Sequence, residues 1–314
     1  MTDTGIVIVT YNSGGAIGAC LDAALRTGAA VVVVDNASVD ETVAEVKKRP
    51  VRLIPNPTNR GFAAAANQGF IALEARDYVL LLNPDAVLTG TIEPLRNACA
   101  QSGVAAAGGC LVDEKGRPQI GFMVRRFPTP AALIFEALLI NRLWPRNPVN
   151  RRYRELDLDA GLPREVEQPA GALLMVRRTA WRAVGGFAEE FFPIWFEDVD
   201  FCRRLADRGD RLLYVPGVVV KHTGGHSISQ ITVEMRRFYW YRSLLRYSAR
   251  HFGSVAFRGV CLAVVTGSVL RMIAELISQR NLKPVAVYGE VVQFASRCLL
   301  VGWREDLPGS RPQG

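Results

Sequence analysis

The chain contains 314 residues, of which 49% are hydrophobic and 22% are charged, so we expect a packed core and exclude an intrinsically disordered chain. Its formal net charge of +8 favours anionic partners, such as phosphorylated substrates, an acidic membrane surface or nucleic acid. The six cysteines form no CxxC pair, which indicates buried, reduced thiols rather than a disulfide framework or a zinc site. Strand-like sequence begins the chain without a basic and apolar leader, so we expect a cytoplasmic protein without a secretion signal.

Apolar runs alternate with segments of helical spacing in the first part of the chain. We expect buried strands at 6–9, 30–34, 51–54 and 78–82, and helices at 16–26, 40–48 and 62–74. Strands that alternate with helices of this length predict βαβ units and a parallel sheet. The chain has neither a GxGxxG nor a P-loop motif, so a dinucleotide-binding fold or a P-loop ATPase has no motif support.

The run Tyr78–Leu82 is stopped by Asn83, Pro84 and Asp85. Proline cannot continue a central strand, so Asp85 is predicted just past the carboxyl end of a buried strand, where open α/β sheets bind ligands. Its carboxylate suits Mg²⁺ or Mn²⁺ that carries a diphosphate, and the alternative role is a helix cap. The same edge of the sheet would gather Tyr11, Asp35 and Arg60, for which caps and turns are again the alternative.

The alternation fades in the middle of the chain. We expect further strands at 103–112, 169–176, 211–216 and 218–221, and a short helix that begins at Thr179. Residues 113–168 are rich in Arg, Pro and Asn and are predicted to be loops, which either cover an acceptor site or connect elements at the surface.

Three carboxylates, Glu197, Asp198 and Asp200, follow Trp195 at the expected start of a helix. Acidic residues are common in a first helical turn, where they favour the helix dipole. Aromatic residues on both sides predict partial burial instead, which suits a carboxylate to accept a proton. Both interpretations stay open from the residues alone.

Two histidines follow the last expected strand. His222 stands at the strand terminus beside glycines and is favoured over His226 as a metal or phosphate ligand, although a lone histidine is usually structural.

The C-terminal third is predicted to be helical, with helices at 235–252, 255–278 and 284–303 that mix apolar residues and arginines. Arg258 and Arg271 leave an apolar stretch shorter than the roughly 20 residues that span a bilayer. We expect either in-plane attachment to an anionic membrane surface or a helical bundle or homodimer interface.

Six short motifs occur in order: VIVTYN (7–12), VDNASVD (34–40), NRGF (59–62), LNPD (82–85), FEDVD (196–200) and VKHTG (220–224). Together they resemble the family 2 glycosyltransferases of the GT-A fold, particularly bacterial rhamnosyltransferase-like members, over about residues 5–252. The resemblance implies an α/β, Rossmann-like GT-A fold with C-terminal helices appended. It implies a catalytic domain at 1–232, with nucleotide-binding and acceptor-binding halves at 1–112 and 113–232, followed by helices at 233–314.

The resemblance also implies roles for individual residues. Asp198 matches the catalytic base, and Asp85 and His222 match ligands of a Mg²⁺ or Mn²⁺ ion. The nucleotide-sugar site would comprise Thr10, Tyr11, Asn12, Asp35, Asn36, Arg60, Gly61, Asn83 and Gly171, and the acceptor site Trp195, Glu197 and Asp200. One departure concerns the metal: Asn83 stands where the family's acidic motif has its first acid, and an amide is a weaker ligand than a carboxylate.

The implied activity is inverting transfer of a sugar, rhamnose for instance, from a dTDP- or UDP-sugar to a hydroxyl of a glycan or a polyprenyl-diphosphate-linked acceptor, in cell-wall or O-antigen polysaccharide synthesis. The enzyme would act in the cytoplasm or on the inner face of the plasma membrane, without nucleic acid. The alternatives are a polyprenyl-phosphate sugar synthase and a non-catalytic nucleotide-sugar-binding protein.

Overall fold

The computed structural model describes residues 3–224, 232–279 and 283–304, and it separates into two compact units. The first unit comprises residues 1–127, 157–189 and 197–230, and the second comprises 128–156, 190–196 and 231–314. The second unit thus combines the C-terminal helices with two segments from the middle of the chain. The predicted domain boundary at 232/233 stays a prediction.

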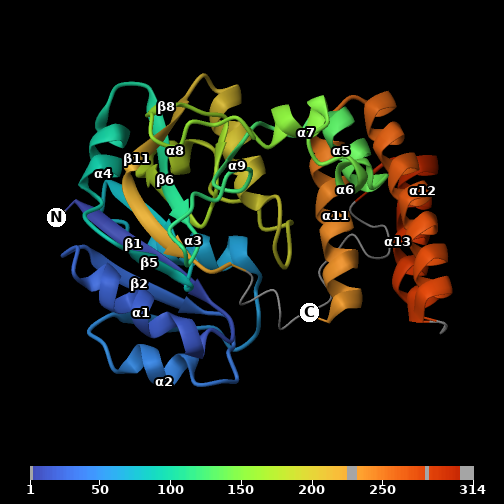
Figure 1. Cartoon of the computed structure of the whole chain (residues 1–314). Coiled ribbons are helices and arrows are strands. Elements are labelled where there is room, and N and C mark those ends of the chain that lie inside the picture. Colours follow the sequence, from blue (N-terminus) through green and yellow to red (C-terminus); the bar gives the residue numbers. More distant parts are fainter. Residues whose placement is uncertain (1–2, 225–231, 280–282, 305–314) are drawn as a thin grey trace. The chain divides into compact units, whose positions relative to one another are not determined.

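A nine-stranded sheet forms the centre of the first unit (Figure 1), in the order β3-β2-β1-β4-β10-β6-β11-β5, with β8 beside β11. Its strands are β1 (Thr4–Thr10), β2 (Ala30–Asp35), β3 (Arg52–Pro55), β4 (Tyr78–Leu82), β5 (Ala86–Leu88), β6 (Val104–Val112), β8 (Arg164–Glu165), β10 (Leu173–Arg177) and β11 (Arg211–His222). A separate two-stranded sheet joins β7 (Val124–Arg125) to β9 (Gln168–Pro169). Because side chains alternate between the two faces of a strand, the uninterrupted apolar runs give the sheet two buried faces.

Helices cover both faces of this sheet. They are α1 (Gly14–Leu25), α2 (Thr42–Lys47), α3 (Phe62–Ala72), α4 (Glu93–Ala100), α8 (Arg178–Ala183) and α9 (Glu197–Asp207). One core joins Ile6 and Ile8 of β1 to the buried side chains of α1 and α4. The other joins Val7 and Val9 to those of α3, α8 and α9. The first unit is therefore a three-layer α/β/α arrangement, and the predicted fold class is confirmed.

The sheet differs from the sequence prediction in direction and in detail. Strands β1 to β4 are parallel as expected, but β10 runs antiparallel to both β4 and β6. The two short strands expected at 211–216 and 218–221 form one strand, β11, with an irregularity between Val215 and Val219. Residues 113–168 were expected to be loops, yet they include α5 (Pro130–Ala137), α6 (Ile140–Leu143) and α7 (Pro148–Tyr153). Thr129 and Asn147 cap α5 and α7 and supply the local signal for those two helices.

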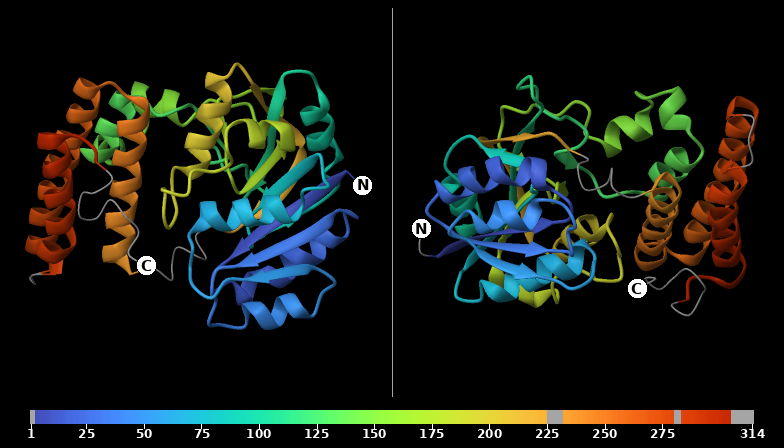
Figure 2. Two further views of the ribbon diagram at one scale, coloured as in Figure 1. Left: turned by 180° about the vertical axis from the view of Figure 1, so that it is seen from behind. Right: turned by 90° about the horizontal axis from the view of Figure 1, so that it is seen from below.

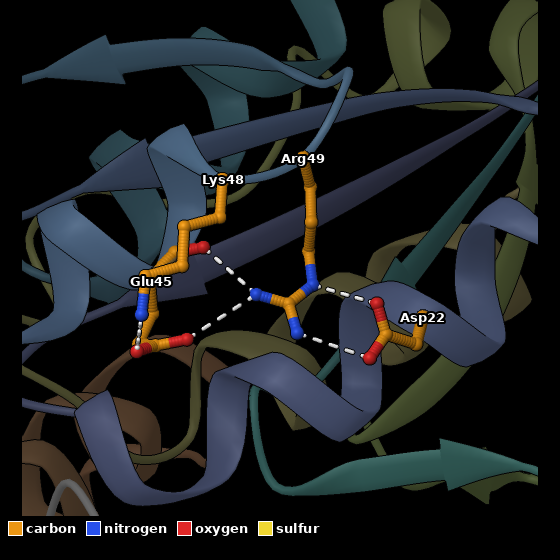
Figure 3. Close-up of polar contacts among 4 residues, drawn as sticks. All are labelled: Asp22, Glu45, Lys48 and Arg49. Atoms are coloured by element: carbon orange, nitrogen blue, oxygen red, sulfur yellow. Dashed lines mark hydrogen bonds and ion pairs between the residues drawn. The ribbon is translucent and has the colours of Figure 1, made fainter.

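An ion-pair network connects α1 to α2 on the surface of the first unit (Figure 3). Arg49 donates from Nε and Nη2 to the two carboxylate oxygens of Asp22, at 2.7 and 3.0 Å. Its Nη1 also bonds the carbonyl and carboxylate oxygens of Glu45. This bidentate geometry orients α2, the helix that follows the Asp35 loop, relative to α1. Exposed ion pairs of this kind contribute little to the free energy of unfolding.

The second unit is helical. The long helices α11 (Val233–His251), α12 (Ser254–Gln279) and α13 (Lys283–Val301) lie side by side (Figure 2), and α5 packs on α12. Gly267 allows this last contact, since a Cβ atom there would lie 1.9 Å from the carbonyl oxygen of Ala137.

Two of these helices are long and apolar enough to cross a membrane, judged by length and composition alone: Ser254–Ser278 and Pro284–Val301. The expectation that Arg258 and Arg271 make the first stretch too short does not hold on that measure. Long arginine side chains can extend toward water from an apolar helix, which relaxes the limit.

All six cysteine thiols are free and buried, as predicted. Burial raises the pKa of both Cys99 and Cys298 to about 12. A thiol that resists ionisation is a poor nucleophile and metal ligand, so these side chains serve packing.

Candidate active site

The strand registers bring the predicted site residues to one edge of the sheet. Thr10 pairs with Asp35 at the carboxyl ends of β1 and β2. Leu173 pairs with Leu82 across the antiparallel β10–β4 ladder, and the Asn83 N–H donates to the carbonyl oxygen of Ala172 at 3.0 Å. Therefore Gly171, two residues before β10 begins, lies at the same edge as the carboxyl ends of β1, β2 and β4.

The Asp35 carboxylate is buried and held by hydrogen bonds from its own neighbourhood. The Thr10 hydroxyl donates to Oδ1 at 2.9 Å, and Ser38 donates its hydroxyl to Oδ1 and its N–H to Oδ2. Asn12, with a φ of 48°, donates its N–H to the Ser38 hydroxyl oxygen at 2.8 Å. These contacts give Asp35 one orientation, and the Ser38 contribution was not anticipated from the sequence.

The Asn36 side chain, just after β2, binds the loop that contains Arg60 and Gly61. Its Nδ2 donates to the carbonyl oxygen of Gly61 at 3.1 Å, and its Oδ1 accepts from Asn56 at 3.0 Å. The exposed Arg60 guanidinium pairs with no residue that the structure describes. The Arg60 N–H donates to Asn36 Oδ1 at 3.4 Å, so the loop attaches this unpaired cation next to Asn36, while Tyr11 is half-buried just after β1.

Asp85 and His222 lie together, as predicted, and both are buried. His222 Nε2 is 3.6 Å from Asp85 Oδ1 and 3.3 Å from the Asn83 amide nitrogen. The Gly224 N–H donates to the other Asp85 oxygen at 2.9 Å. One carboxylate oxygen and one ring nitrogen therefore face each other, which is the arrangement of two ligands to one cation.

Gln119 sets the protonation pattern of the His222 ring. Its Oε1 lies 3.1 Å from Nδ1, and its Nε2 donates to the His222 carbonyl oxygen at 2.7 Å. Burial lowers the pKa of His222, while the nearby Asp85 carboxylate acts in the opposite direction. In the neutral ring the Gln119 oxygen can only accept, so Nδ1 carries the proton and Nε2 keeps its lone pair. Phe122 stacks on the ring at a centroid distance of 5.3 Å and holds its plane.

Asp198 lies in the first turn of α9 with a fixed carboxylate. Oδ2 accepts from the Gly171 N–H at 3.0 Å and from Gln168 Nε2 at 3.3 Å, while Oδ1 accepts from the Val199 N–H at 2.8 Å. A Cβ atom at residue 171 would lie 3.1 Å from the Cβ of Asp198 and 3.2 Å from Oδ2. Gly171 therefore permits this approach. Its contact is with the Asp198 carboxylate, and its assignment to the nucleotide site stays a prediction.

The other predicted acceptor residues lie in different surroundings. Asp200 is fully buried and accepts from Arg204 Nε at 2.7 Å, and Arg204 also bonds the carbonyl oxygens of Val184 and Gly186. Glu197 is buried at the start of α9. Trp195 belongs to the second unit. Their roles in acceptor binding stay predictions, but Asp200 has a clear structural partner.

The site offers few protein side chains that could bind a metal ion. Within residues 3–224, 232–279 and 283–304, no three or more His, Cys, Asp or Glu side chains form a group that could hold a metal ion. A divalent ion beside Asp85 and His222 would complete its coordination with substrate phosphate and water, which is how Mg²⁺ commonly binds.

Two protein-family models match the chain. Residues 5–161 match the model described as Glycosyl transferase family 2, and residues 160–300 match Glycosyl transferase family group 2. The chain is 33% identical over 290 residues to an N-acetylglucosaminyl-diphospho-decaprenol L-rhamnosyltransferase of Mycobacterium tuberculosis (strain ATCC 25618 / H37Rv), covering 82% of this chain and 92% of the relative. It is 28% identical over 184 residues to a rhamnosyltransferase of Escherichia coli (strain K12), covering 55% of this chain and 62% of the relative.

Solved structures agree with the fold. The chain is similar to a crystal structure of GalNAc-T7 with UDP, GalNAc and Mn²⁺, with a TM-score of 0.54, 15% identity and coverage of 80% of this chain and 50% of that one. It is also similar to Staphylococcus aureus TarS, with a TM-score of 0.50, 14% identity and coverage of 95% and 55%. At these identities the likeness concerns the fold alone.

Proposed function

The chain belongs to glycosyl transferase family 2, and from this premise we propose that it transfers a rhamnosyl group from a nucleotide-diphosphate sugar to a hydroxyl of a prenyl-diphosphate-linked glycan during cell-wall polysaccharide synthesis. The observation that carries the proposal is the 33% identity to the mycobacterial rhamnosyltransferase, since it covers 92% of that enzyme. The donor would be a dTDP- or UDP-sugar, because an Asp35 carboxylate can accept the imide N–H that both bases share.

The proposed reaction is a single displacement with inversion. Asp198 takes the proton from the acceptor hydroxyl while that oxygen attacks the anomeric carbon and the bond to the nucleotide diphosphate breaks. The fixed Asp198 carboxylate supports this role, because a general base must hold its oxygen against the reacting hydroxyl. Arg60 would bind the diphosphate, since its guanidinium has no other partner among the described residues.

Asp85 and His222 fit a divalent cation, on the grounds of their adjacent oxygen and nitrogen atoms and the neutral ring that Gln119 maintains. When bound, Mg²⁺ or Mn²⁺ would neutralise charge on the departing diphosphate. Asn83 presents its amide nitrogen to the Nε2 lone pair of His222 in this geometry, so a bound cation would take the place of that hydrogen bond.

The test of this function is transfer from dTDP-rhamnose and UDP-sugars to N-acetylglucosaminyl diphosphate farnesol, with the product's mass determined by mass spectrometry and its anomeric configuration by NMR. We expect a disaccharide on the lipid diphosphate, with the anomeric configuration opposite to that of the donor. A glycosyl phosphoprenol as the product would instead identify a polyprenyl-phosphate sugar synthase. Donor binding without turnover on any acceptor would leave only a nucleotide-sugar-binding protein.

We expect Asp85→Ala to remove the dependence of donor binding on divalent cations. The substitution deletes the hard oxygen ligand next to His222, and losing a charged interaction of this kind costs roughly 1.5–3 kcal/mol, or about 10–100-fold in affinity. Calorimetric titration of dTDP and UDP with Mn²⁺ or with EDTA measures the effect. Asp22→Ala, on the surface of α1, is the matched control. Equal donor affinity in parent and Asp85→Ala, both unaffected by EDTA, would contradict the metal role.

The proposed location is the cytoplasmic face of the plasma membrane, where a water-soluble donor and a lipid-linked acceptor meet. The net charge of +8 and the apolar helices of the second unit support attachment to an anionic surface. Flotation with phosphatidylglycerol vesicles at low and high salt checks it; protein that stays at the bottom of the gradient in both would argue against attachment.

A further inference from the structure

A cavity of about 440 Å³ lies within the second unit, among α5, α6, α11, α12 and α13. Its lining combines arginines, aromatic rings and two glutamates: Arg142, Arg236, Arg237, Arg271, Trp195, Trp240, Tyr241, Tyr288, Leu139, Ala274, Glu136 and Glu275. The four arginines and two glutamates give the lining a formal charge of +2. None of these residues is predicted to bind the nucleotide sugar or to act as the base, and Trp195 is the one lining residue that belongs to the predicted acceptor site.

The glutamates of the cavity have partners. Glu275 bonds Arg237 at 2.8 Å and accepts from the Tyr288 hydroxyl at 2.7 Å. Glu136 accepts from Asn141 at 2.8 Å and lies 3.7 Å from an Arg154 nitrogen. Their negative charge is therefore neutralised by arginines of the second unit, so the glutamates should not repel an anion in the cavity.

Two of the four arginine side chains form no hydrogen bond or ion pair with a described residue. Arg271 donates to the carbonyl oxygens of Glu136 and Ala137, and Arg237 pairs with Glu275. By contrast, the guanidinium groups of Arg142 and Arg236 bond no residue within the described part of the chain. A guanidinium group binds phosphate oxygens through parallel hydrogen bonds. A diphosphate has one negative charge on each phosphate, so each of the two free guanidinium groups could bind one phosphate.

The rest of the lining is apolar and continues on α12. Trp195, Trp240 and Leu139 supply flat hydrophobic surface inside the cavity. Beside Ala274, the exposed Leu270, Ile273 and Ile277 lie on one face of α12, at the spacing of an apolar stripe. A ligand with an anionic head and a long hydrocarbon tail matches both features.

Resting on the proposed function, we propose that this cavity binds the diphosphate and first isoprene units of the lipid-linked acceptor, with Arg142 and Arg236 on the two phosphates. The volume suits such a group, because ligand pockets of about 300–1,000 Å³ enclose molecules of that size. The cavity and the proposed base are close in sequence, since the lining residue Trp195 stands three residues before Asp198. The tail leaves along the α12 stripe toward the membrane.

The detergent-solubilised full chain is titrated with farnesyl diphosphate, inorganic pyrophosphate and farnesol, and binding is followed by calorimetry and by intrinsic tryptophan fluorescence, to which Trp195 and Trp240 contribute. We expect farnesyl diphosphate to bind at least about 10-fold more tightly than either fragment, because head and tail are both recognised. The double variant Arg142→Ala/Arg236→Ala should bind it about 10–100-fold more weakly, with unchanged affinity for UDP or dTDP. Arg258→Ala is the matched control, an exposed arginine on α12 outside the cavity.

A thermal melting curve shows whether the double variant is folded, and Arg142→Lys/Arg236→Lys, which keeps the charges, should recover part of the affinity. Parent-like farnesyl diphosphate affinity in the alanine variant would overturn the proposal. So would equal displacement by phosphatidylglycerol, because the cavity would then accept any anionic lipid head group. If sugar transfer occurs but the double variant keeps the parent's acceptor KM, the cavity assignment fails while the proposed function stands. If the cavity binds farnesyl diphosphate as described but no acceptor is glycosylated, the function fails instead.

Discussion

Asp198→Asn is expected to lower the rate of sugar transfer by about 10²–10⁴-fold while donor affinity stays nearly unchanged, the usual scale for loss of a general base. The amide has the size of the carboxylate, and its single oxygen can keep the hydrogen bonds from Gly171 and Gln168 while the one from Val199 is lost, so most contacts at the start of α9 should persist. It cannot accept the proton of the acceptor hydroxyl. The change therefore isolates proton transfer from folding and from nucleotide binding.

Steady-state transfer and donor titration on the same preparations measure both quantities. Glu197→Gln is the informative comparison, because this neighbouring carboxylate is buried at the start of α9. It should affect turnover less than Asp198→Asn does. Transfer at the parent rate by Asp198→Asn would refute the base assignment, and loss of transfer in Glu197→Gln alone would move the role to that residue.

Asp200→Ala is expected to destabilise the first unit by about 3–5 kcal/mol, because it leaves the buried end of an ion pair without its partner. Asp200 is fully buried, and Arg204 is 16% exposed and bonded to the carbonyl oxygens of Val184 and Gly186. Removing the carboxylate leaves the guanidinium with only neutral partners where α9 meets the loop after α8.

Urea unfolding followed by circular dichroism measures this effect. Asp207→Ala is the matched control, since that exposed carboxylate also pairs with an arginine four residues away on α9, at 2.8 Å from Arg203. The control should change stability by less than about 1 kcal/mol. If Asp200→Ala keeps the parent's stability and raises only the acceptor KM, the original acceptor-binding prediction would be favoured over a structural role.

The contrast between these two aspartates shows where sequence reasoning stops. Successive residues on a helix point about 100° apart, so Glu197, Asp198 and Asp200 face different surroundings although their motif looks uniform. Burial and partners distinguish them, and both depend on segments distant in sequence, such as Gly171 and Val184. The sequence predicted that a carboxylate would matter here, and the tertiary contacts separate the structural aspartate from the base candidate.

The strand ends were predictable for a local reason. Asn83–Asp85 stops a buried strand by proline chemistry, and Asp35 follows an unbroken valine run, so their common edge followed from the alternation of strands and helices. The antiparallel direction of β10 was not predictable, because a five-residue apolar run carries no sign of its direction. Gln119 and Gln168 were missed because they lie in segments without periodicity, where only the folded chain brings them to His222 and Asp198.

Because its six thiols are buried, the folded protein should react little with thiol-directed labels. A maleimide reacts with an accessible thiolate, and burial limits access to all six native thiols and raises the pKa of Cys99 and Cys298. A single cysteine introduced on an exposed position, such as Arg258 on α12, would carry a fluorophore or spin label without first removing the native six. Spectroscopic probes can thus be attached to either unit of the otherwise natural chain.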